Sequence, residues 1–219
     1  MKTHWKKTLK NVSFMILMLT MCVAFGQKII IVLDPGHGGL DSGAVGINGI
    51  QEKDVVLDIA NEIVKWNRTL FENRFEIYLT RYSDTLISLS DRGHLAKNLN
   101  ADVFISIHCN ASNRAAKGIE VYVNSTVSAP VNNHHASAMA LSEAILNQCH
   151  KKLGFKKRGA KTANFQVLRE NSAYYPSILI ETGFVTNADE ADYFSKDENR
   201  KALALGILMG IINYLNIEP

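Results

Sequence analysis

The sequence predicts a single α/β domain over residues 27–219, in which a mostly parallel central sheet of about six strands is flanked by helices on both faces. Two observations carry this prediction. Short, near-continuous apolar runs alternate with longer segments whose apolar residues recur at helical spacing, a pattern typical of strands that are covered on both faces. The length suits one core, and no internal repeat, proline-rich linker or appended module divides the chain.

The expected strands are five apolar runs and one weaker candidate. In chain order they span residues 28–33, 75–80, 102–107, 118–123 and 177–181, with a short sixth strand expected at 165–168. Several of these runs are apolar nearly throughout rather than alternating, as strands buried on both faces require.

Four segments between and after these strands are expected to form helices. They span residues 53–70, 89–99, 136–153 and 198–215. The first carries Val56, Ile59 and Ile63 at helical spacing, which predicts one apolar face toward the sheet. The last is apolar nearly all round over 202–215, which is too short to span a membrane and indicates a buried core helix.

The first 26 residues are typical of a secretory signal peptide. Four lysines precede an apolar run at 12–25, and small residues at 24 and 26 predict cleavage after Gly26. A retained membrane anchor is the alternative. A lipoprotein signal at Cys22 is disfavoured because Met21 stands where a small residue is needed. We therefore expect a periplasmic or secreted protein with no stable membrane span after processing.

The net charge bears on nucleic-acid binding, and the cysteine content bears on disulfide formation. The signal removes four of the 24 basic residues and none of the 21 acidic ones, which leaves a formal charge of −1 on the mature chain. This balance gives no support to nucleic-acid binding. Cys109 and Cys149 remain in the mature chain. An oxidising compartment permits a disulfide between them, and two free, partly buried thiols are at least as consistent with the sequence.

Ionisable side chains follow three of the expected strands, at the point where each strand ends. The first strand runs into a glycine-rich loop that carries His37, another delivers His108, and the last delivers Glu181. Ligands bind beyond the carboxyl ends of the strands in open α/β sheets, so we expect these groups at one edge. Glu52 lies where the glycine-rich loop meets the first helix, and a carboxylate there also suits the helix dipole.

Two imidazoles and a carboxylate are the ligand set of a catalytic zinc site whose fourth position is left for water. His37, Glu52 and His108 are therefore candidate metal ligands, and Glu181 is a candidate general base. The glycines would let the loop of His37 curl around a metal, and the loop lacks the Gly-Lys-Ser/Thr ending of a phosphate-binding loop. The alternatives are surface histidines, a simple helix-terminal charge at Glu52 and a buried ion pair at Glu181.

Four motifs occur in order: "LDPGHGGLDSGAVGINGIQEKDVVLDIA", "SLSDRGHLAKNLNADVFISIHCNAS", "GIEVYV" and "PSILIETGFVTNADEADYF". Together they resemble the catalytic domain of the zinc-dependent N-acetylmuramoyl-L-alanine amidases (amidase type 3 family), from about residue 28 to 215. The resemblance implies one zinc ion bound by His37, Glu52 and His108, with Glu181 as the catalytic base. It also implies hydrolysis of the peptidoglycan amide between N-acetylmuramic acid and L-alanine. Cys109 stands where the family often has alanine.

Further polar residues are expected around this site or at the surface. Asp34 and Asn110 are expected behind the ligands or at the rim. Arg169 either contacts a carboxylate or carbonyl of the substrate or forms a plain salt bridge. Surface roles are expected for the other histidines of the mature chain, which are His94, His134, His135 and His150.

Two other functions stay open on the sequence. The first is a zinc peptidase of similar architecture, which would cut within the stem peptide. The second is a wall-binding module that has lost the catalytic chemistry. A purely structural role is disfavoured, because it would leave the polar residues at the strand ends unexplained.

Some relatives carry a long insertion after the "GIEVYV" strand, which covers the zinc until an activator displaces it. Here ten residues at 124–133 are too few for a plugging helix with its connections. We therefore expect an open site that requires no activator protein.

Overall fold

The computed structural model describes residues 12, 28–125 and 133–216. The expected signal peptide at 1–26, apart from Val12, and most of the 124–133 connection lie outside these residues, so both remain predictions. Within the described residues, no helix combines the length and the apolar character needed to cross a membrane.

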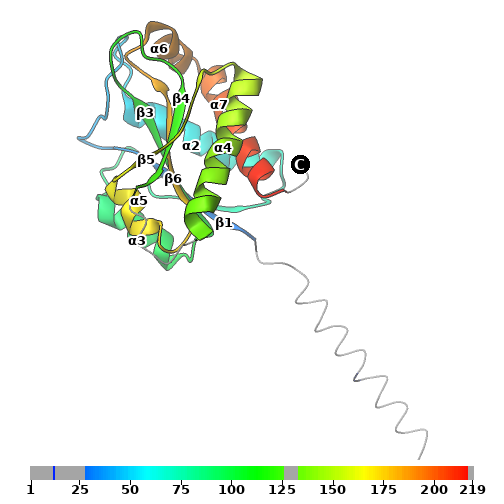
Figure 1. Cartoon of the computed structure of the whole chain (residues 1–219). Helices are drawn as coiled ribbons and strands as arrows, with labels where there is room; N and C mark the ends of the chain where they lie inside the picture. The colour runs from blue at the N-terminus through cyan, green and yellow to red at the C-terminus, as the bar shows by residue number, and fades with distance from the viewer. Residues whose placement is uncertain (1–11, 13–27, 126–132, 217–219) are drawn as a thin grey trace, which may run out of the picture.

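Six strands form one sheet through the middle of the molecule (Figure 1). They are β1 (Ile30–Pro35), β2 (Glu76–Leu79), β3 (Val103–Asn110), β4 (Ile119–Asn124), β5 (Lys157–Ala163) and β6 (Ser177–Phe184). Their order across the sheet is β2-β1-β3-β6-β4-β5. The first four in this order are parallel, whereas β4 runs antiparallel to β6 and pairs in parallel with the edge strand β5. The sheet is therefore mostly parallel, as predicted.

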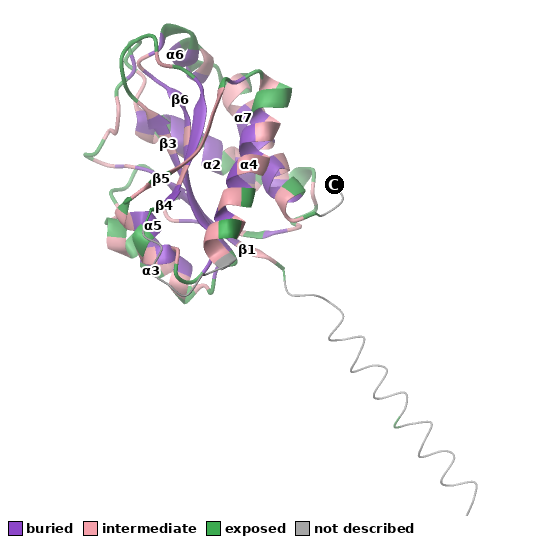
Figure 2. Ribbon diagram, viewed as in Figure 1, coloured by how far each residue is buried: buried purple, intermediate pink, exposed green. Residues whose placement is uncertain are grey.

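Helices cover both faces of this sheet, as predicted (Figure 1). They are α2 (Glu52–Thr69), α3 (Leu89–Asn98), α4 (Asn133–Leu153), α5 (Gln166–Asn171), α6 (Ala188–Ser195) and α7 (Asp197–Tyr214). Helices α2, α4 and α7 bury the larger core on the face of Leu33 and Ile105. Helices α3 and α5 bury a smaller core on the face of Val32 and Phe104. The strands between the two cores are mostly buried (Figure 2).

The prediction of the sixth strand is wrong. Residue 165 is the N-cap of helix α5 and residues 166–168 belong to that helix, whereas the sixth strand is β5. Its sequence, KRGAKTA, has no fully buried residue, so this edge strand lacks the apolar run that reveals a buried strand. Helix α6 is a further element that the periodicity does not predict; its N-cap, Asn187, accepts hydrogen bonds from the backbone N–H groups of Asp189 and Glu190. The other expected strands and helices are present, with ends shifted by a few residues.

The two cysteines among the described residues, Cys109 and Cys149, are free thiols, and both are buried. Burial raises the pKa of the Cys149 thiol to about 12 and holds the pKa of Cys109 well above its usual value. Both thiols therefore stay protonated near neutral pH, where the thiolate is the reactive form. Of the two alternatives left by the sequence, the structure contains the free thiols.

A buried ion pair joins the end of β1 to α3. Arg92 Nη1 donates to Asp34 Oδ1 at 2.7 Å, and neither side chain is more than 3% exposed. The hydroxyl groups of Thr80 and Ser106 donate to the two oxygens of the same carboxylate, each at 2.7 Å. Asp34 therefore ties β1 to α3, to β3 and to the segment that follows β2.

Replacing Arg92 by methionine should destabilise the fold by about 3–5 kcal/mol, because it leaves the buried carboxylate of Asp34 without its counter-ion. Urea unfolding followed by circular dichroism measures this change. The matched control is Lys65→Met, which breaks the surface pair with Glu62 and should alter the free energy of unfolding by less than about 1 kcal/mol. Equal losses in the two variants would contradict a structural role for the buried pair.

Candidate metal centre

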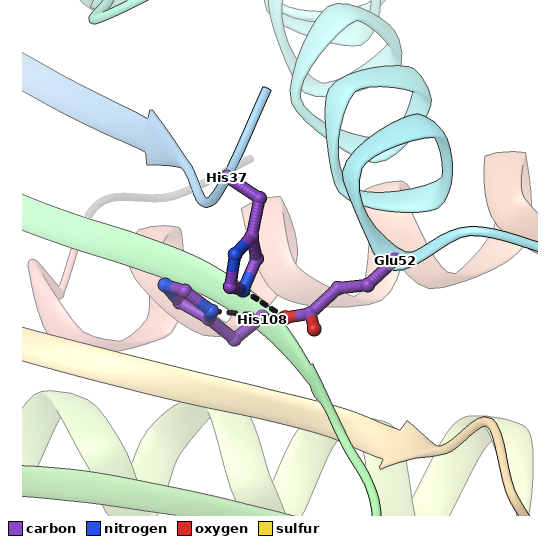
Figure 3. A group of neighbouring side chains, drawn as sticks. All are labelled: His37, Glu52 and His108. Atoms are coloured by element: carbon purple, nitrogen blue, oxygen red, sulfur yellow. Dashed lines mark hydrogen bonds and ion pairs between the residues drawn. The ribbon is translucent and has the colours of Figure 1, made fainter. Parts of the chain in front are cut away.

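Three side chains from three separate elements converge at one edge of the sheet (Figure 3). His37 lies on the loop after β1, Glu52 is the first residue of α2, and His108 lies near the end of β3. Glu52 Oε1 is 3.1 Å from His37 Nε2 and 2.9 Å from His108 Nδ1. One donor atom of each residue lies within 4.8 Å of the other two, so the three could hold a metal ion.

Two glycines make this close approach possible. A Cβ atom on Gly36 would lie 2.2 Å from Cε1 of His108. A Cβ atom on Gly43, whose φ is +64°, would lie 2.5 Å from Oε2 of Glu52. Any side chain at either position would displace one of the three converging residues. The glycine-rich loop is therefore shaped around the side chains of the site itself.

Glu52 is almost fully buried, at 3% exposure, and still carries its charge. Besides its histidine partners, Oε1 accepts from the backbone N–H of Cys109 at 2.9 Å, and Oε2 accepts from that of Ala44 at 2.8 Å. Burial alone would raise the pKa of Glu52, but His108 and His37 more than reverse this effect and hold the pKa well below its usual range. The site thus presents a fixed anion that favours a cation.

Asp41 orients His37, although the sequence did not single it out. Its Oδ2 lies 2.8 Å from Nδ1 of His37, while Nε2 of the same ring faces Glu52. A carboxylate behind an imidazole is the usual support of a metal-binding histidine. Burial lowers the pKa of His37, but Glu52 and Asp41 outweigh burial and raise this pKa to about 9. The available signal was an acidic residue four positions after the histidine in the glycine-rich loop.

Two buried arginines hold the loop that carries His37. Arg81 donates to the carbonyl oxygens of Pro35 at 3.0 Å and Gly36 at 2.8 Å. Arg92 donates to those of Pro35 at 2.9 Å and His37 at 2.8 Å. His37 has a φ of +59°, a left-handed conformation that few residues with a Cβ adopt. The two guanidinium groups stabilise this conformation and so fix the direction of the imidazole.

Glu181 lies beside His108 with one unpaired oxygen. The two residues are directly opposite each other in the β3–β6 pairing. Oε2 of Glu181 is buried and has no hydrogen-bond partner in the part of the chain that is described. Burial raises the pKa of Glu181 to about 7, with His108 opposing the rise and Glu52 and Glu120 adding to it. A carboxyl group with this pKa can accept and return a proton near neutral pH.

An open groove of about 780 Å³ leads over this site. The segment before α3 forms one wall and the start of α5 forms the other. Because α3 and α5 have only 10 and 6 residues, they leave the edge of this face of the sheet open. The lining combines the site residues with apolar walls: His37, His108, Glu181, Leu86, Ile87, Leu89, Phe165 and Val167. The groove therefore suits an elongated substrate with apolar and polar parts.

The remaining predicted residues lie outside the group of three. Asn110 donates from Nδ2 to Glu120 at 2.9 Å and does not line the groove. Arg169 donates to the backbone and side-chain oxygens of Asn164, both at 3.0 Å, and does not line the groove. The cluster that could hold a metal includes none of the other described histidines, namely His94, His134, His135 and His150.

Comparison with known proteins identifies the relatives of this fold and sequence. A family model described as N-acetylmuramoyl-L-alanine amidase matches residues 31–213. A sporulation-specific N-acetylmuramoyl-L-alanine amidase of Bacillus subtilis is 37% identical over 191 residues, which cover 86% of this chain and 69% of that protein.

Solved structures of similar fold include two further amidases. The N-acetylmuramoyl-L-alanine amidase AmiC2 of Nostoc punctiforme has a TM-score of 0.77 and 34% identity, covering 87% of this chain and 99% of that chain. An N-acetylmuramoyl-L-alanine amidase of Clostridium difficile 630 also has a TM-score of 0.77, with 32% identity over 89% of this chain and 100% of that chain. The single α/β domain with a six-stranded, mostly parallel sheet is shared with these structures.

Replacing Glu181 by glutamine should stabilise the chelator-treated protein more as the pH rises. The folded-state pKa of about 7 lies above the ordinary value of 4.5, so the wild type loses stability between these two pH values while the variant does not. We expect the difference in unfolding free energy to grow by about 1–3 kcal/mol from pH 4.5 to 8. Urea unfolding across this range measures it. The exposed control Glu72→Gln should show no such growth, and a flat difference for Glu181→Gln would contradict the raised pKa.

Proposed function

Since the chain belongs to the N-acetylmuramoyl-L-alanine amidase family, we propose that it is a zinc-dependent peptidoglycan hydrolase. Its substrate bond is the amide between N-acetylmuramic acid and the L-alanine of the stem peptide. We assign the zinc ligands to His37, Glu52 and His108 and the catalytic acid–base role to Glu181.

The observation that carries this proposal is the joint placement of three donor atoms and one unpaired carboxylate oxygen. His37, Glu52 and His108 offer two imidazole nitrogens and a carboxylate oxygen, the set that catalytic zinc takes while a fourth position stays open. This donor set fits zinc better than magnesium or calcium, which prefer oxygen ligands. The buried Oε2 of Glu181 lacks a partner among the described residues, as a base that faces an attacking water would.

The side chains of the site divide the chemistry between them. Bound zinc would polarise the scissile carbonyl and lower the pKa of a coordinated water to about 7. Glu181, with a pKa of about 7, accepts the proton of the attacking water and then returns it to the leaving nitrogen of L-alanine. Asp41 holds the ring of His37 in the orientation that leaves Nε2 free to bind. The groove holds the substrate on both sides of the scissile amide.

We place the protein outside the cytoplasm, in the periplasm or secreted, where peptidoglycan lies. The lysine-rich, apolar segment at 1–26 supports export. A zinc peptidase would cut inside the stem peptide, and a wall-binding module would cut nothing. The family match favours the amidase over both, and the presence of all four site residues argues against a module that has lost the chemistry.

We expect the enzyme to work without an activator protein. In the described residues, the groove opens on His37, His108 and Glu181. The connection between β4 and α4, residues 125–132, has eight residues, fewer than a covering helix with its own linkers needs.

Purified residues 27–219, loaded with zinc, should release intact stem peptides with a free L-alanine amino group from purified sacculi without any added protein. Mass spectrometry of the soluble products identifies this cut. A chelator should abolish release, and added zinc should restore it. Peptides cut internally would show a peptidase instead, and release that needs a second protein would contradict the open site.

Two variants separate metal binding from proton transfer at the site. His108→Ala should lose its zinc, because only two ligands remain. Glu181→Gln should keep zinc at full occupancy while turnover falls by about 10²-fold or more, since the shape stays and the base is gone. Metal analysis and peptidoglycan turnover are measured on the same preparations. Full zinc content in His108→Ala, or zinc loss in Glu181→Gln, would overturn the corresponding assignment.

A further inference from the structure

A second charged cluster lies next to the metal centre. Its middle is Glu120, which is 2% exposed and accepts through Oε1 from Asn110 at 2.9 Å and Tyr122 at 2.8 Å. The other oxygen of Glu120 accepts from Nε of Arg158 at 2.5 Å and from Nζ of Lys161 at 2.6 Å. Both cations belong to the edge strand β5. The mechanism described above uses neither of them.

The cluster continues the row of side chains that forms the site. His108 on β3 lies opposite Glu181 on β6, and Glu181 lies opposite Glu120 on β4. The β4–β5 pairing shifts register at this level and brings Arg158 beside Glu120. Residues opposite each other on neighbouring strands point to the same face of a sheet. An imidazole, two carboxylates and a guanidinium therefore follow one another from the metal centre to the edge of the sheet.

The two cations of this cluster share one carboxylate, Glu120, and both are partly exposed. Glu120 supplies one negative charge to two cations, whose side chains are 29% (Arg158) and 38% (Lys161) exposed. Within the described residues, Arg158 donates through Nε alone, so both of its Nη groups remain available. Its guanidinium lies over the ring of Phe184, 4.9 Å from the centroid, which restricts its orientation. Two cationic side chains with several available donors thus lie at the surface, beside the row of Glu181.

We propose that Arg158 and Lys161 bind a free carboxylate of the stem peptide, on the leaving-group side of the scissile amide. This inference rests on the proposed function. The sugar side of the substrate carries hydroxyl and acetamido groups without charge, whereas the stem peptide carries free carboxylates. A planar guanidinium with two available Nη groups matches a carboxylate in a bidentate arrangement. The peptide then crosses β4 and β5, and the sugar lies toward the loop of His37.

Distance selects which carboxylate is bound. Neighbouring strands are roughly 4.8 Å apart, so cations on β5 that reach back over β4 lie roughly 5–10 Å from Glu181. The α-carboxylate of the second stem residue is within two residues of the scissile nitrogen, at most roughly 7 Å in an extended chain. Carboxylates of later residues lie farther out. The cluster also adjoins the groove, since Phe165 of its wall packs edge-on against Tyr122, with centroids 5.4 Å apart.

Two substrates that differ in one group test the proposal. The acid is N-acetylmuramoyl-L-alanyl-D-glutamic acid with its γ-carboxyl capped as the methylamide and its α-carboxyl free, and the second compound is the same molecule with the α-carboxyl converted to the amide. The zinc-loaded wild type should cleave the acid with about tenfold higher kcat/KM, because only the acid offers a charge-assisted acceptor. In the double variant Arg158→Gln, Lys161→Gln this ratio should fall to about one, mostly by loss of rate on the acid. Both rates come from one preparation, so their ratio is independent of the folded fraction.

The matched control is the double variant Lys65→Gln, Arg68→Gln, which removes the same charge from α2 and should keep the tenfold ratio. Binding of both compounds to zinc-loaded Glu181→Gln, followed by calorimetry, gives a second readout, in which the acid should bind about tenfold more tightly. Equal kcat/KM of the wild type on both compounds, or an unchanged ratio in the β5 double variant, overturns the carboxylate site alone. No cleavage of either compound by zinc-loaded wild type overturns the proposed function.

Discussion

The hydrogen bonds to the carboxylate of Glu52 are the interaction on which the geometry of the site depends. A buried anion is tolerated only where donors surround it, and here the donors come from β3, from the loop after β1 and from the glycine-rich segment that leads into α2. Each donor is therefore held at hydrogen-bonding distance from one of the two carboxylate oxygens of Glu52. The two imidazoles are positioned before any ligand arrives, which reduces the reorganisation that binding requires.

Order around this carboxylate is maintained by polar groups rather than by the apolar core. Residues in the left-handed region carry roughly 1–3 kcal/mol of strain unless their surroundings enforce it, and His37 has a φ of +59°. Arg81 and Arg92 enforce it through four hydrogen bonds to three consecutive carbonyl oxygens. The buried carboxylate of Asp34 in turn neutralises Arg92. The large apolar core beneath α2, α4 and α7 stabilises the fold as a whole, whereas these polar contacts fix the position of His37.

Most of the fold and the three converging side chains could be predicted from the sequence, because buried parallel strands are apolar runs and their carboxyl ends meet at one edge. The same rule does not find Glu120 and Arg158, because it considers only residues at the carboxyl ends of strands. They stand at the amino ends of β4 and β5, and these ends reach the site only because both strands run opposite to β6. Strand direction is set by tertiary pairing, which no local pattern reveals. Asp41 was missed for a related reason, since only the folded loop shows that its carboxylate faces His37.

The position of β5 at the edge of the sheet has an evolutionary consequence. Every other strand at the site has neighbours on both sides, so a change of residue there must fit two packed surfaces, whereas β5 pairs only with β4. None of its seven residues is fully buried, so a new side chain there has fewer packed neighbours to fit than one on a central strand. Lineages of this fold can therefore diverge at β5 while the residues that converge on Glu52 stay constant. Selection for a substrate with different charged groups would therefore be expected to change residues of β5 first.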